Sequence, residues 1–133
     1  MNKWMGCLVV MISCALVLLV AQNEAVTGDR SSPLRPLAGD GNVGVSNAVL
    51  RDQSEIRVLR VMVAPGGRRE MHSHDNVQYH LFTPISASMQ LQLGDGTSLE
   101  VAPWHPYFMP AGTQHGFRND GADPVEIIEV FVR

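Results

Sequence analysis

The chain has 133 residues, 45% of them hydrophobic, with a formal net charge of −3. This length allows one small domain with a core of its own and excludes two. The acidic balance offers no basic patch, so we expect no nucleic-acid partner.

The first segment resembles a secretory signal peptide. Lys3 precedes an uncharged apolar run over residues 5–21, and polar residues follow at once. We expect removal of residues 1–21 by cleavage after Ala21, and export to the periplasm or secretion. Both cysteines, Cys7 and Cys14, would leave with this segment. If it were retained, the apolar run would instead anchor the protein in a membrane.

The next segment, residues 22–44, is polar and contains several Gly, Pro and Ser residues. This composition is typical of a flexible lead, which would separate the folded domain from the export segment. We therefore place the domain at residues 45–133.

Short segments with strand character, separated by turns, fill this domain. The predicted strands are residues 45–50, 56–64, 77–82, 88–93, 99–102, 107–109, 115–118 and 124–132. Alternation of apolar and polar residues with Gly-containing turns indicates an all-β fold, either a sandwich or a small barrel.

Two histidines lie at a spacing that suits a metal. His72 and His74 are two residues apart, so on a strand both imidazoles would point to the same face and reach one ion. Neutral imidazoles bind divalent transition metals, and here Fe, Mn, Zn, Cu and Ni all remain candidates. Two histidines do not make a tight site, so a third ligand must come from elsewhere.

Two motifs make the chain resemble a small single-domain cupin of the cupin type-2 group. Gly66, His72 and His74 match the opening of that family's first motif. Its second motif, P-x-G-x-x-H-x-x-x-N, is matched without a gap; the matching residues are Pro110, Gly112, His115 and Asn119. The resemblance implies a double-stranded β-helix barrel of the jelly-roll type, with His72, His74 and His115 as metal ligands.

The chain departs from the family at the fourth ligand. The family has a Glu four or five residues after the second His, where this chain has Gln78 and Tyr79. Gln78 could still offer a neutral amide oxygen. If a regular strand starts at residue 77, Gln78 and His80 share a face, so His80 is an alternative ligand. His80 and Tyr79 could also act from the second shell.

Other residues receive less specific predictions. His105 is expected in a loop, and Asn119 is expected to close a turn, because the sequence Asn-Asp-Gly favours hairpins. The aromatic residues expected to fill the barrel or line a ligand pocket are Phe82, Trp104, Phe108 and Phe117.

The predicted function follows from the charge of the site. Neutral ligands leave a divalent ion with its full charge, which would attract a small anionic chelating molecule. The resemblance favours a dioxygenase or oxidase; the alternative is a non-catalytic module that binds or senses a metal or small ligand. No residue is assigned to catalysis. Since such barrels commonly pair through their strand edges, we expect a homodimer.

Overall fold

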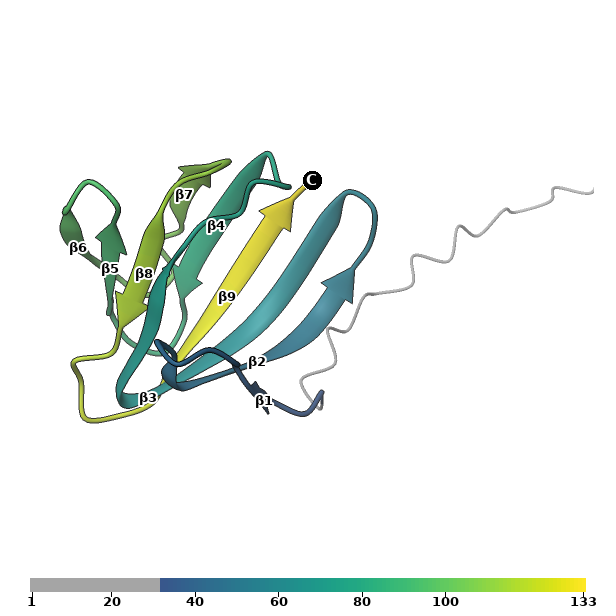
Figure 1. The fold of residues 1–133 in the computed structure, drawn as a ribbon. Coiled ribbons are helices and arrows are strands. Elements are labelled where there is room, and N and C mark those ends of the chain that lie inside the picture. Colours follow the sequence, from purple (N-terminus) through teal and green to yellow (C-terminus); the bar gives the residue numbers. More distant parts are fainter. Residues whose placement is uncertain (1–31) are drawn as a thin grey trace, which may run out of the picture.

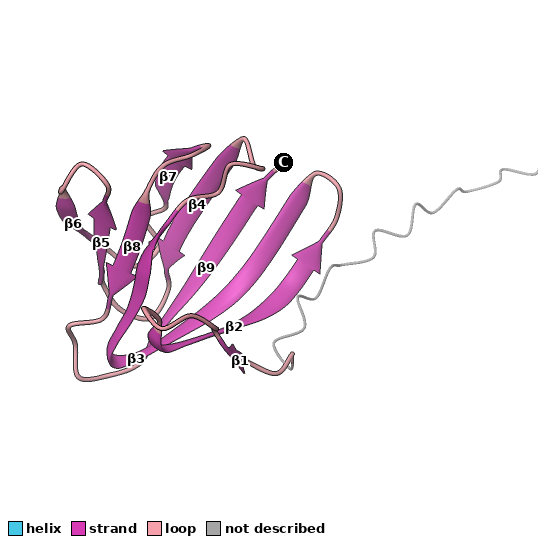
Figure 2. Ribbon diagram, viewed as in Figure 1, coloured by secondary structure: helices cyan, strands magenta, loops and turns pink. Residues whose placement is uncertain are grey.

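The computed structural model describes residues 32–133, and in this part of the chain all regular elements are strands (Figures 1 and 2). They are β1 (Arg35–Pro36), β2 (Val43–Asp52), β3 (Ile56–His72), β4 (Tyr79–Pro84), β5 (Met89–Leu93), β6 (Ser98–Val101), β7 (Tyr107–Pro110), β8 (His115–Arg118) and β9 (Val125–Val132). The strands pair in antiparallel fashion, in the order β6-β5-β8-β3-β9-β4-β7; β2 also pairs with β3, and β1 pairs with β2. The predicted all-β barrel is confirmed.

The predicted signal peptide, residues 1–21, lies outside the described residues. Within residues 32–133, the structure contains no helix that is long and apolar enough to span a membrane.

β3 belongs to both halves of the barrel, as Figure 1 shows. Its first part pairs with β2 and β9, and its last part, up to His72, pairs with β8. Residues 65–67 form the bend between the two parts. Gly66 has a φ of 69°, a conformation that side chains rarely adopt. The predicted strand ended at Ala64 because Pro-Gly-Gly is a turn signal, but here it bends the strand without ending it.

The hydrophobic core fills the space between the two halves. Alternate residues of the strands point inward, and the fully buried ones include Phe82, Leu91, Met109 and Ile127. Each such side chain contributes about 1.5–3 kcal/mol through removal of apolar surface from water.

The second part of the predicted lead is folded against the barrel. β1 pairs with β2, and Leu37 packs on the core. Asn42 accepts hydrogen bonds from Arg69 Nη1 (2.7 Å) and from the backbone N–H of Glu70 (3.2 Å). The fold therefore begins before residue 45, because this polar segment has partners on β2 and β3.

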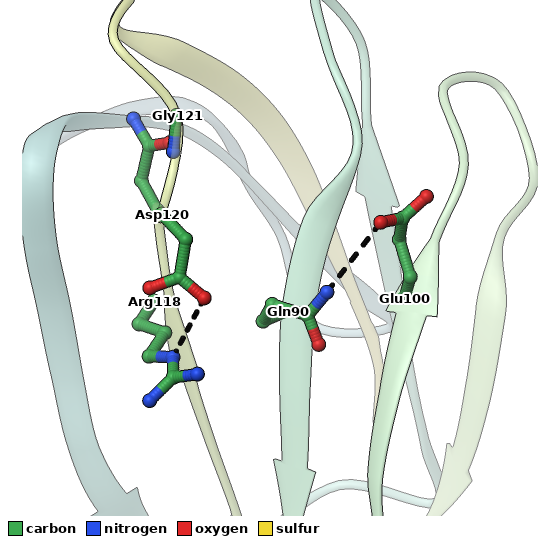
Figure 3. Close-up of polar contacts among 6 residues, drawn as sticks. Gln90, Glu100, Arg118, Asp120 and Gly121 are labelled. Atoms are coloured by element: carbon green, nitrogen blue, oxygen red, sulfur yellow. Dashed lines mark hydrogen bonds and ion pairs between the residues drawn. The ribbon is translucent and has the colours of Figure 1, made fainter.

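The outer surface around β5, β6 and β8 is polar. Figure 3 shows Gln90 on β5 donating to Glu100 on β6 (3.5 Å), and the ion pair of Arg118 with Asp120 (2.9 Å). Exposed pairs of this kind contribute at most about 1 kcal/mol. The ion pair of Arg118 marks the side of β8 opposite to the one that carries His115 and Phe117.

Asn119 holds the bend of β3 in place, and its predicted role in a turn is confirmed. Its side chain accepts from the N–H of Gly121 (2.9 Å) and donates to three backbone carbonyls, those of Val63 (3.2 Å), Ala64 (3.2 Å) and Asp123 (2.7 Å). Asn119 is buried, so water cannot replace these partners.

Replacing Asn119 with Ala should lower the free energy of unfolding by about 2–3 kcal/mol, because buried backbone groups lose their partners. Urea denaturation followed by circular dichroism measures this loss. Asn76, which is exposed, is the control, and its Ala variant should stay within about 0.5 kcal/mol of the parent. Equal losses in both variants would contradict the role given to Asn119.

Candidate metal centre

His72 and His115 face each other across the β3–β8 pair. They are direct partners in the register, and their ring centroids lie 4.3 Å apart. Arg69 is paired with Phe117 in the same ladder, and the register shifts between Arg69 and His72. Residues three apart on a regular strand point to opposite faces, so this bulge is what lets Arg69 and His72 both line the interior.

The close fit of β8 against the bulge depends on Gly116. A Cβ atom at this position would lie 2.8 Å from the carbonyl oxygen of Arg69 and 3.1 Å from Met71 Sδ. Any side chain here would push β8 away from β3 and separate His115 from His72.

His74 reaches the same point from a loop. β3 ends at His72, and the backbone carbonyl of His74 accepts a hydrogen bond from Gly112 N–H (3.1 Å). The His74 ring lies 4.9 Å from that of His72 and 5.4 Å from that of His115. The two histidines were expected to share a strand face; they converge because the turn at residues 110–112 holds the loop.

The three rings offer nitrogen atoms that suit one ion. One ligand nitrogen from each of His72, His74 and His115 lies within 4.8 Å of the others. Nδ1 of His72 lies 2.8 Å from the Glu70 carbonyl oxygen, and Nδ1 of His115 lies 2.9 Å from that of Thr113. A carbonyl can only accept, so each Nδ1 carries the proton and each Nε2 keeps its lone pair.

The free lone pairs are sheltered from water. Nε2 of His74 and Nε2 of His115 are buried without a hydrogen-bond partner in the structure. Burial lowers the pKa of both rings to about 4, and it also lowers the pKa of His72. The rings are therefore neutral at pH 7, as metal ligands must be. Three neutral imidazoles, two of them with a buried Nε2 that has no partner in the structure, fit a divalent transition metal and leave coordination positions open.

Gln78 and His80, the two candidates for a fourth ligand, lie in different surroundings. Gln78 precedes β4 and is exposed, and its backbone bonds to Val132 O (2.7 Å) and Ala111 N (3.1 Å). His80 is 1% exposed, and its ring lies 5.0 Å from His74 and 4.9 Å from His115. The expected strand start at residue 77 is two residues early. The structure therefore brings His80, and not Gln78, to the three histidines.

Glu129 was not singled out in the sequence, yet it lies beside this cluster. It is 6% exposed, and its Oε1 lies 3.6 Å from His80 Nε2, within ion-pair range but too far for a hydrogen bond. Burial alone would raise the pKa of Glu129, but the neighbouring histidines, His80 above all, lower it. The signal was present: the inward residues of β9 alternate, and Glu129 falls among them.

The aromatic candidates divide into two groups. Phe82 and Phe117 are buried with centroids 5.2 Å apart, and Phe117 also lines the cavity described below. Trp104 and Phe108 are 69% and 54% exposed, so they do not fill the barrel. Tyr79 is exposed as well and contacts Phe108 (4.7 Å). Outside this set, His105 lies in an exposed loop, as expected.

Two small cavities meet at the cluster. The inner one, about 60 Å³, is lined by Leu37, Val45, Asn47, Leu59, Val61, Arg69, His72, His74, Phe117, Glu129 and Phe131. The outer one, about 90 Å³, shares Leu59, His74 and Phe131 with it and adds Arg57 and Arg133. Their volumes suit a ligand of a few non-hydrogen atoms.

Comparisons with known proteins agree with this architecture. The family model described as a cupin domain, Cupin_2, matches residues 59–131. No curated protein sequence matches the chain. Solved structures do match, at identities that show the fold alone.

Three of these structures illustrate the similarity. The polyketide cyclase RemF from Streptomyces resistomycificus is 23% identical, with 77% of this chain and 74% of that chain covered and a TM-score of 0.68. A predicted oxalate decarboxylase from Thermotoga maritima is 17% identical, with 77% and 93% covered and a TM-score of 0.68. An RmlC-like cupin from Shewanella frigidimarina is 14% identical, with 78% and 86% covered and a TM-score of 0.64.

The family model spans more than half of the chain, and the barrel that it predicts is the barrel observed. The protein is a small member of the cupin family.

Proposed function

We propose that the protein holds a divalent transition metal through His72, His74 and His115 and uses it to bind a small anionic chelating substrate. The observation that carries this proposal is the convergence of three neutral imidazoles, two of them with buried, unpartnered Nε2 atoms. When bound, such a metal supplies open coordination positions that polarise a chelating anion or activate dioxygen.

The position of Arg69 is evidence for an anionic substrate. Its side chain lines the inner cavity with His72 and His74, and its Nη1 donates to Asn42 Oδ1 (2.7 Å). This bond fixes the guanidinium, which has further N–H groups suited to a carboxylate. Arg57 and Arg133 line the outer cavity and add positive charge along the approach to His74.

The proposed reaction is an oxidation of the dioxygenase or oxidase type. The protein's part is to hold the substrate: Arg69 binds its anionic group, and Phe117 and Phe131 exclude water from the inner cavity. Oxygen uptake by the metal-loaded protein, with a panel of small carboxylates, tests this class. Anion binding without turnover would assign the same site to binding or sensing.

Replacing His72 and His115 together with Ala should abolish metal binding and leave the β-rich circular dichroism spectrum unchanged. The parent should take up about one equivalent of metal per chain after loading and dialysis, measured by elemental analysis. His105→Ala is the control, because His105 is exposed on a loop away from the cluster, and it should keep full uptake. A double variant that retains a full equivalent would remove the basis of the proposal.

Replacing Arg69 with Ala should weaken oxalate binding to the metal-loaded protein at least about tenfold, because charge-assisted hydrogen bonds are lost. Metal affinity should be unchanged within about threefold. Arg68→Ala is the matched control: Arg68 is the exposed neighbour on the same strand. Calorimetric titration measures both constants. An equal effect of the two substitutions would show that Arg69 contributes only general charge.

We also propose that the protein is exported, on the evidence of the apolar run after Lys3. N-terminal sequencing of the exported protein should start at Gln22. An exported form that starts at Met1 would contradict cleavage. That the protein forms a homodimer stays a prediction, and analytical ultracentrifugation would measure its oligomeric state.

A further inference from the structure

Glu129 is buried among apolar side chains, where a carboxylate lowers the stability of the fold. Its partners in the β3–β9 and β4–β9 ladders are Leu59 and Phe82. The side chains of these two residues have no group that forms a hydrogen bond with a carboxylate. Oε1 is buried without a hydrogen-bond partner, and the side chain lines the inner cavity with His72 and His74. An ionised carboxylate in such surroundings destabilises the fold unless a positive or polar group compensates it.

The fold does not require an acid at this position. The other inward residues of β9 are Val125, Ile127 and Phe131, all apolar and all part of the core. A residue that breaks the pattern of its strand, at a cost in stability, points to a function.

The carboxylate lies where a metal centre would use it. Oε1 of Glu129 lies 3.6 Å from Nε2 of His80, and the His80 ring neighbours both His74 and His115. Histidine ligands of metals commonly donate their second N–H to a carboxylate, which orients the ring and strengthens its donor nitrogen. Neither ring nitrogen of His80 has a hydrogen-bond partner in the structure, so Nε2 can carry the proton that faces Glu129 while Nδ1 offers its lone pair to an ion.

We propose that Glu129 is the acidic member of the metal centre. It orients His80 as the fourth ligand and balances part of the ion's charge. It thus supplies from β9 the negative charge that the exposed Gln78, which precedes β4, does not supply. This inference rests on the proposed function, because it requires that His72, His74 and His115 bind a metal.

Three consequences separate this role from simple core packing. Glu129→Gln keeps the shape of the side chain but removes its charge, so metal should bind more weakly. The loaded site would then carry one positive charge more, so an anion should bind to it more tightly. The metal-free variant should be about as stable as the parent, because Oε1 of Glu129 has no hydrogen-bond partner to lose. A purely structural residue would lower metal affinity and stability together.

The experiment is a competitive zinc titration on the full chain, followed by oxalate titration of the zinc-loaded protein and urea denaturation of the metal-free protein. Glu129→Gln should lower zinc affinity about 10–100-fold. Glu126→Gln is the matched control: Glu126 is on the same strand, faces the other side, and pairs with Arg60 (2.9 Å). This control and Gln78→Glu should stay within about threefold of the parent. Glu129→Asp keeps the charge and should bind zinc more tightly than Glu129→Gln.

The outcomes are distinguishable. A parent protein that takes up no metal overturns the proposed function and this inference together. If the parent binds zinc and Glu129→Gln binds it equally well, the inference alone fails. It also fails if Gln78→Glu tightens zinc binding, or if Glu129→Asp binds no better than Glu129→Gln. Should Glu129→Gln not fold, a Glu129→Asp variant that binds zinc as weakly as the His72/His115 double variant would overturn it.

Discussion

The path of β3 is the constraint on which the centre of the barrel depends. The strand bends at residues 65–67, passes from one half of the barrel to the other, and bulges between Arg69 and His72. The bend is held by the buried side chain of Asn119, and the bulge is accommodated by Gly116. Without the bulge, Arg69 and His72 would point to opposite faces. The placement of Arg69 and of the candidate ligand His72 in one cavity is thus a property of a single strand.

The interior combines an apolar core with a polar centre, and the buried polar groups of this centre lower the stability of the fold. His80, His115 and Glu129 are buried among phenylalanine and aliphatic side chains, and several of their polar atoms have no partner. Phe131 stacks on His80 and contacts the edge of His74, so the rings are held in fixed orientations. A preorganised set of this kind costs stability and would favour a bound ion.

The charge of the site is decided by residues from separate parts of the chain. His72 and His115 come from β3 and β8, His74 from a loop, and His80 and Glu129 from β4 and β9. A metal held by the three motif histidines alone would keep its full double charge. With Glu129 beside them, as proposed, the site would carry less positive charge, so it would bind a metal more tightly and an anion more weakly. Arg69 then restores a positive group on the side where a substrate would lie.

Local patterns in the sequence determined much of this protein. Alternating residues and glycine turns predicted eight of the nine strands of the described part, and the two-residue spacing of His72 and His74 predicted that both reach one point. These two signals are local, since they depend on the two-residue period of a strand and on turn chemistry. His115 was added by the resemblance to the cupin family. Only the tertiary structure decided that β3 continues through Pro-Gly-Gly, that Gln78 is exposed and His80 buried, and that Glu129 lies beside His80. Those facts depend on which strands become neighbours and in what register, and neither the composition of a strand nor its alternation contains that information.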